Sequence, residues 1–247
     1  MVSSSFRWLL DLIFPPRCPI CQTIVSASEN GRIICSACKK DIKPIQSPYC
    51  PRCGLPYYPS EEDGGEEKSH LCGSCLQEQR YFEIHRTCAL YEGALKEAIH
   101  RFKYGGVFSL VRIFGDLLQS TLTTLTQDYS VDVMVPVPLH IRRLRERGFN
   151  QALLLAKELN TRTGIPYAER ALKKVKDTPV QITLKKKERK KNLKGAFQVK
   201  DHETIQGKTV VLMDDVYTTG ATVNECSRIL LEAGADRVAV LTVARAL

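Results

Sequence analysis

Two adjacent acids near the end of the chain are the first residues whose type and spacing suggest chemistry. Asp214 and Asp215 follow a continuous apolar run that begins at Thr209, a pattern typical of a buried parallel strand. We expect that strand to end at the two acids. A turn rich in hydroxyls and backbone N–H groups comes next, and it comprises Thr218, Thr219, Gly220, Ala221 and Thr222. Carboxylates suit sugar hydroxyls and such a turn suits a phosphate, so the pattern predicts a sugar-phosphate site.

A helix should begin directly after this turn. Apolar residues recur on one helical face from Val223 to Ala233, and Thr222 with Glu225 has the spacing of a capping box. In an α/β sheet, ligands bind where the carboxyl ends of strands meet the amino ends of helices. We therefore expect the phosphate site at that edge; the alternative is an ordinary solvated turn.

Arginines suggest a second anion-binding segment. Residues 131–137 predict a strand, and the sequence IRRLRERGFNQ after it predicts a turn that leads into a helix over residues 152–160. Guanidinium groups can bind a phosphate through two parallel hydrogen bonds, whereas the alternative for part of this run is a solvated basic face. From the turn chemistry we single out Arg147, Gly148, Asn150 and Gln151.

Eight of the ten cysteines occur as four C-x-x-C pairs. Thiolates at this spacing can bind one tetrahedral zinc ion, so sequential grouping predicts two closed, structural zinc sites. Interleaved grouping, disulfides and redox pairs are the alternatives, and zinc would imply a reducing cytoplasm. The predicted ligands are Cys18, Cys21, Cys35 and Cys38 for one site and Cys50, Cys53, Cys72 and Cys75 for the other.

Composition sets the outer limits. The 247 residues, with 43% hydrophobic and 26% charged side chains, allow one large or two small domains. The net charge of +9 favours an anionic partner such as nucleic acid, a phosphorylated substrate or a membrane surface. The sequence contains no apolar run of the ~18 residues that a membrane helix needs, and no signal peptide is expected.

The expected organisation has three parts. Residues 1–17 predict a short amphipathic helix that packs on the protein itself or, alternatively, lies on a membrane or partner. Residues 18–78 form the zinc-ribbon domain, and residues 80–247 form a larger α/β domain. Within the larger domain we expect strands over 82–91 and 237–247, helices over 93–104 and 108–125, and a basic block over 169–199 that is a hood over the site, a nucleic-acid surface or an exposed hairpin.

Several motifs fit one protein family. DDVYTTGAT at 214–222 resembles the phosphoribosyl pyrophosphate (PRPP) motif of type I phosphoribosyltransferases. HRFKYGG at 100–106 and RERGFNQ at 145–151 resemble further motifs of the ComF family of competence proteins, as do Thr178, Gln181, Arg189, Asn192, Ala196 and Phe197. With the cysteine ribbons, the resemblance covers essentially the full chain.

The resemblance implies a fold and a set of ligand contacts. The fold is the type I phosphoribosyltransferase fold, a central and mostly parallel sheet with flanking helices, preceded by a small zinc-ribbon domain. Asp214 and Asp215 would hold the ribose hydroxyls, and residues 218–222 would bind the 5′-phosphate. Mg²⁺ would bridge the ribose hydroxyls and pyrophosphate, whose charge Lys103, Arg145 and Arg147 would offset.

The resemblance also implies a biological role. Members of the family are associated with uptake of transforming DNA, which suggests a PRPP-like or nucleotide-like ligand, single-stranded DNA and proteins of the uptake machinery as partners. The expected location is the cytoplasm, with the inner face of the membrane as an alternative. The alternative function is an active phosphoribosyltransferase that transfers ribose 5-phosphate from PRPP to a nitrogen acceptor, and whether the protein catalyses a reaction is left open.

Overall fold

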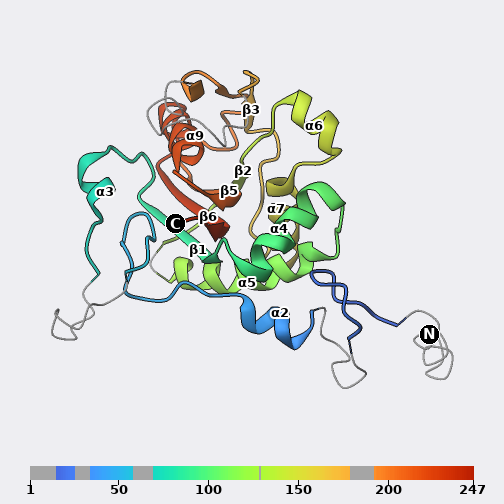
Figure 1. The fold of residues 1–247 in the computed structure, drawn as a ribbon. Coiled ribbons are helices and arrows are strands. Elements are labelled where there is room, and N and C mark those ends of the chain that lie inside the picture. Colours follow the sequence, from blue (N-terminus) through green and yellow to red (C-terminus); the bar gives the residue numbers. More distant parts are fainter. Residues whose placement is uncertain (1–14, 26–33, 58–68, 128, 179–191) are drawn as a thin grey trace.

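The computed structural model describes residues 15–25, 34–57, 69–127, 129–178 and 192–247 (Figure 1). The helix predicted over residues 1–17 lies almost entirely outside these residues. Among the described residues, no helix is both long and apolar enough to span a bilayer.

A sheet of four parallel strands forms the centre of the molecule, in the order β1-β6-β5-β2. The two inner strands are buried along almost their whole length, which explains why their sequences are continuous apolar runs. The predicted central parallel sheet is therefore confirmed. The strands are β1 (Ile84–Leu90), β2 (Val133–Pro136), β5 (Thr209–Tyr217) and β6 (Arg237–Arg245).

Three long helices cover one face of the sheet (Figure 1). Their buried side chains pack against alternate sheet residues, among them Met134, Val211 and Met213. The first of these helices ends where Gly106 takes the left-handed conformation that closes a helix. The helices are α4 (Gly93–Gly105), α5 (Leu110–Thr126) and α7 (Gln151–Thr163).

The opposite face carries a helix and a short hairpin. Helix α9 (Ala221–Glu232) packs with β3 (Leu172–Lys174) and β4 (Phe197–Val199), which pair antiparallel. These two strands are the two ends of the predicted basic block, while residues 179–191 between them lie outside the described residues. The block is thus a hairpin at its base.

The cysteine knuckles attach to opposite faces of the sheet. The first contains α2 (Ser36–Asp41) and packs with the α4, α5 and α7 side, whereas the second contains α3 (Gly73–Gln77) and packs with the α9 side. Figure 1 shows α2 below α4 and α5, and α3 on the far side of the sheet. The segment between the knuckles runs along the edge of β1, where Ile45 N–H donates to Cys88 O at 3.1 Å.

The structure differs from the sequence predictions at three places around the expected site. The arginine-rich segment predicted as a turn begins with a short helix, α6 (Ile141–Arg147), which Gly148 ends in the left-handed conformation. Strand β5 does not end at the acids, because its pairing with β6 continues to Tyr217. The capping-box prediction was wrong: α9 begins at Ala221 without a side-chain cap, and Glu225 accepts a hydrogen bond from Gly195 N–H instead.

Candidate functional site

A cavity of about 530 Å³ lies at the carboxyl ends of β2 and β5. It brings together most of the residues that the sequence analysis assigned to a sugar phosphate, although they come from elements far apart in the chain. Those that line it are Lys103, Arg147, Asp214, Asp215, Thr218, Thr219, Ala221 and Thr222. The parallel sheet causes this convergence, because the carboxyl ends of neighbouring strands meet at one edge.

The two acids have different surroundings. Asp215 is only 8% exposed and forms an ion pair with Lys103 of α4, with 2.8 Å between Nζ and Oδ2. Burial alone would lower the pKa of Lys103, but the charge of Asp215 outweighs it and raises the pKa above its ordinary value. Burial, followed by the neighbouring Asp215 charge, raises the pKa of Asp214 to about 7. Without ligand, the carboxyl of Asp214 therefore keeps its proton to a higher pH than an ordinary aspartate does.

The turn after β5 presents backbone donors. Gly220 has a φ of 75° and is the residue before α9, so the chain enters the helix directly from a left-handed residue. The first N–H groups of a helix have no acceptor within it, and the helix dipole favours an anion there. Among the described residues, the side-chain hydrogen bond within this turn is a long one, from Ala221 N–H to Thr219 Oγ1 at 3.4 Å. The turn can therefore receive a phosphate.

The segment that follows α6 forms the opposite wall. The amide of Asn150 donates to Val137 O at 3.1 Å and accepts from Ala152 N–H at 3.1 Å, which fixes the start of α7 beside the loop after β2. Arg147 donates to Oε1 of Gln151 at 2.7 Å. Gln151 is 2% exposed, lines the cavity and has no partner for Nε2 among the described residues. A buried donor of this kind is free to donate to a polar group that enters the cavity.

Not every predicted residue reaches the cavity. Arg145 is exposed on α6 and is not among the residues that line it, while Gly220 shapes the turn without lining the cavity itself. Lys174 of β3 does line it, although we had not assigned it to the phosphate. Its signal in the sequence was weak, because Lys174 is one of many lysines in the basic block. Thr178 and Asn192 reach the cavity, but Gln181 and Arg189 lie outside the described residues.

The eight paired cysteines form two clusters in the sequential grouping. Within each cluster the four sulfur atoms lie within 4.8 Å of one another, and all ten cysteines are free thiols. Four thiols at this separation fit a tetrahedral zinc ion, which binds sulfur at about 2.3 Å. We call Cys18, Cys21, Cys35 and Cys38 the first cluster, and Cys50, Cys53, Cys72 and Cys75 the second cluster.

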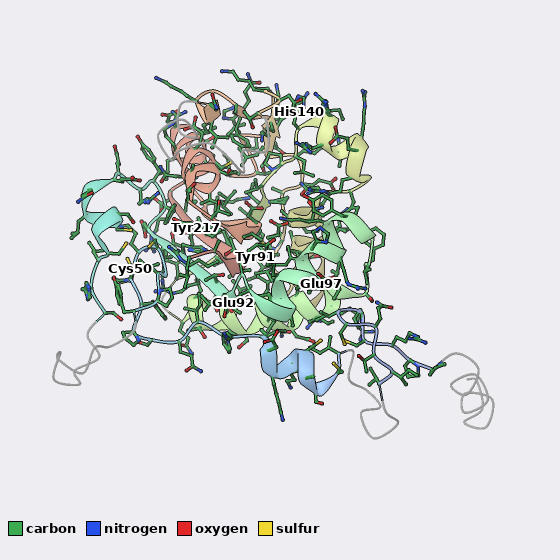
Figure 2. The ribbon with its side chains drawn as sticks, in the orientation of Figure 1. Cys50, Tyr91, Glu92, Glu97, His140 and Tyr217 are labelled. Atoms are coloured by element: carbon green, nitrogen blue, oxygen red, sulfur yellow. The ribbon has the colours of Figure 1, made fainter. Side chains whose placement is uncertain are left out.

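The second cluster adjoins the turn after β5. The carbonyl of Cys53 accepts hydrogen bonds from His85 Nδ1 at 2.8 Å and from Arg245 Nη1 at 2.5 Å. The His85 ring stacks on Tyr217, the last residue of β5, with 4.2 Å between centroids, and the Arg245 guanidinium lies 4.7 Å above the same ring. Burial lowers the pKa of His85 to about 3, so its ring is neutral and carries the proton on Nδ1. Figure 2 labels Tyr217 at the sheet and Cys50 in this knuckle.

The first cluster adjoins the start of α4 instead. Asp41, at the end of α2, accepts a hydrogen bond from Ala94 N–H at 2.7 Å and so caps a helix that has no cap of its own. Lys103 lies near the other end of that helix, roughly 14 Å further along its axis at 1.5 Å per residue. The first cluster therefore contacts the end of α4 that is opposite the cavity-lining Lys103.

Two protein-family models match the chain. Residues 9–76 match the double zinc ribbon domain, and residues 161–247 match the phosphoribosyl transferase domain. Together with the parallel sheet, the second match confirms the predicted type I phosphoribosyltransferase fold. The first match identifies the two cysteine clusters as zinc-ribbon sites.

Curated relatives match nearly the whole chain. Competence protein F of Haemophilus influenzae is 34% identical over 93% of this chain and 97% of its own. DNA utilization protein YhgH of Escherichia coli strain K12 is 32% identical over 96% of this chain and all of its own. Competence protein ComFC of Bacillus subtilis is 30% identical over 81% of this chain and 79% of its own.

Proposed function

Because the chain belongs to the ComF family of competence proteins, we propose that its cavity binds PRPP or a related sugar phosphate with Mg²⁺, in the service of DNA uptake during natural transformation. One observation carries the proposal. Paired acids, a phosphate-sized turn at a helix start and three cationic side chains line a single cavity. This combination suits a ligand that has both hydroxyls and phosphates.

Each wall of the cavity would contact a different part of the ligand. Asp214 and Asp215 would accept hydrogen bonds from the ribose hydroxyls, and the turn before α9 would bind the 5′-phosphate. Lys103 and Arg147 would face the pyrophosphate, with Arg145 close by on the same helix. The cavity would then hold a sugar phosphate by position and charge, without a protein nucleophile.

The same acids would hold the metal. Carboxylate oxygens are the ligands that Mg²⁺ prefers, and Mg²⁺ usually binds one or two of them together with phosphate oxygens of a substrate. When bound, the ion would neutralise part of the pyrophosphate charge. Asp215 would then share its carboxylate between the ion and Lys103, which pairs with its Oδ2 at 2.8 Å.

Titration calorimetry with PRPP and Mg²⁺ tests the proposal. Asp214→Asn should abolish PRPP binding while zinc content stays at that of the wild type. The matched control is Asp236→Asn, which changes an exposed acid before β6 and should bind as the wild type does. Wild-type affinity in Asp214→Asn would refute the assignment.

We also propose that the protein binds single-stranded DNA and meets proteins of the uptake machinery in the cytoplasm, with residues 1–17 as a contact to the inner face of the membrane. The net charge of +9 supports an anionic polymer as partner. Binding of a labelled DNA strand across a salt series tests DNA binding directly. Each phosphate that the protein neutralises makes the logarithm of the binding constant fall more steeply with the logarithm of the salt concentration. A flat salt dependence or absence of binding would remove DNA from the proposal.

The alternative function is an active phosphoribosyltransferase of nucleotide metabolism. The observation in its favour is that the cavity extends past the acids to apolar walls, formed by Pro138, Leu139, Leu193 and Phe197, where a flat nitrogen acceptor could lie. Release of pyrophosphate from PRPP across a panel of acceptors tests this function. A steep salt slope for DNA without pyrophosphate release favours the binding function.

A further inference from the structure

Two aromatic side chains stand in solvent beside the sugar-phosphate cavity. Tyr104 is 65% exposed and Phe108 is 54% exposed, and they are the only aromatic residues among the large exposed hydrophobics of the described chain. Tyr104 lies in the last turn of α4, and Phe108 follows Gly105 and Gly106, where that helix ends. Phe149 lies edge-on against Phe108, with 4.9 Å between ring centroids, so the Phe108 ring is held in place by a neighbouring ring.

These rings line a second cavity of about 560 Å³. Its wall includes Arg143 and Arg147, and it shares Lys103, Tyr104 and Arg147 with the sugar-phosphate cavity. The two cavities are therefore neighbours with a common wall. We call the second one the aromatic pocket.

The arginines of α6 give the aromatic pocket a positive charge that its acids do not cancel. The Arg147 guanidinium lies 5.2 Å from the centre of the Tyr104 ring, and its polar partner is the neutral Gln151. The one acid of the pocket, Glu146, pairs with Arg143 and Arg142. Arg145, on the exposed side of the same helix, has no carboxylate partner among the described residues.

We propose that the aromatic pocket stacks the bases of single-stranded nucleic acid while the α6 arginines bind its phosphates. The inference rests on the proposed DNA binding, and it locates the bound strand at the aromatic pocket, outside the basic block of residues 169–199. Exposed rings beside arginines suit a single strand, because every base has a face that can stack on them. A duplex hides those faces, and an apolar protein partner would leave the arginine charge without a counterpart.

Fluorescence anisotropy with two labelled strands of equal length, oligothymidine and an abasic strand, tests the proposal. Tyr104→Ala should bind oligothymidine about tenfold more weakly, which is within the range for loss of one stacked base, and should bind the abasic strand as the wild type does. Phe108→Ala should act in the same direction. Tyr104→Phe keeps the ring and should restore binding.

The matched control is Leu76→Ala. Leu76 is 70% exposed on α3 of the second cluster, so this variant removes exposed apolar surface far from the aromatic pocket and should bind as the wild type does. Equal binding by wild type, Tyr104→Ala and Phe108→Ala would overturn the pocket assignment and leave DNA binding intact. If equimolar thymidine monophosphate displaces the strand, the pocket binds a free nucleotide, and its assignment to single-stranded nucleic acid is overturned. No binding of either strand by the wild type would reject DNA binding itself.

Discussion

The two zinc-ribbon clusters have the same ligands and the same C-x-x-C spacing, yet they occupy different positions in the fold. The first cluster packs beside the start of α4, where Asp41 caps the helix. The second cluster packs beside the end of β5, where Cys53 is linked through His85 and Arg245 to Tyr217. The comparison teaches that ligand spacing identifies a metal site without revealing what the metal supports.

The position of the second cluster matters for the turn after β5, because this turn packs on Tyr217. Gly220 has no side chain, and a Cβ built on it would meet the Tyr217 hydroxyl, so the turn folds directly over the Tyr217 ring. Arg245 also points Nη2 at the Cys53 sulfur at 3.8 Å, where a cation would offset thiolate charge. We expect zinc in the second cluster to hold Tyr217 and the phosphate turn, and zinc in the first cluster to affect only α4.

Removal of one ligand from each cluster gives the largest expected effect. Cys53→Ser and Cys21→Ser should each lose one of two zinc ions by metal analysis, because a structural site needs its four thiolates. Cys53→Ser should also weaken PRPP binding by about tenfold, or about 1.4 kcal/mol, because Tyr217 and the phosphate turn lose their support, whereas Cys21→Ser should keep it. Equal loss of PRPP affinity in the two variants would contradict the comparison.

Truncation of one buried side chain beside each cluster separates stability from function. Tyr217→Ala and Ile20→Ala remove side chains that are 3% and 2% exposed, and each should cost about 2–5 kcal/mol in the free energy of unfolding. Only Tyr217→Ala should weaken PRPP binding, as measured by calorimetry below both melting transitions. Tyr217→Phe should behave as the wild type, because the ring rather than the hydroxyl makes the stacking contact. Weakened PRPP binding in Ile20→Ala would show that the effect is general destabilisation.

Two glycines with the same backbone conformation isolate the contact with Tyr217. Gly220 and Gly164 have φ of 75° and 74°, so alanine at either should cost about 1–2 kcal/mol from the left-handed conformation. Around Gly164 an added Cβ meets nothing within 4 Å, whereas at Gly220 it meets the Tyr217 ring. Gly220→Ala should therefore lower the melting temperature more than Gly164→Ala. Equal melting temperatures would mean that the turn does not rest on the ring.

Much of the architecture could be predicted because the responsible physics is local in the sequence. Apolar runs predicted the inner strands, and thiol spacing predicted both clusters. The acids and the turn were also found, since a strand end and a helix start are adjacent in the chain. These features need only neighbours within a few residues.

The contacts that distinguish the clusters could not be predicted in this way. Arg245 and Cys53 are 192 positions apart, and nothing in either segment signals that a guanidinium will meet that carbonyl. The family resemblance assigned both Arg145 and Arg147 to pyrophosphate, but only Arg147 of these two lines the cavity, and α6 leaves Arg145 in solvent. The capping box failed because α9 begins at Ala221, two residues too early for Thr222 to be its N-cap.

The smallest expected effect is a change in how stability depends on pH, caused by Asp214 on the sheet face that carries the second cluster. Asp214 lies near Lys174 and Asp215, and its pKa is raised from 3.8 to about 7 in the folded protein without ligand. Between pH 4 and pH 7 the folded state therefore binds more protons than the unfolded state, so this residue makes stability fall as pH rises through that window. Asp214→Asn removes the effect, and its melting temperature should exceed that of the wild type at pH 8 but not at pH 4. Scanning fluorimetry without PRPP or Mg²⁺ measures the difference, with Asp236→Asn as the control. If the melting temperatures of Asp214→Asn and the wild type differ by the same amount at both pH values, Asp214 is ionised throughout. The sheet face that carries the second cluster would then hold no protonated carboxyl beside the phosphate turn.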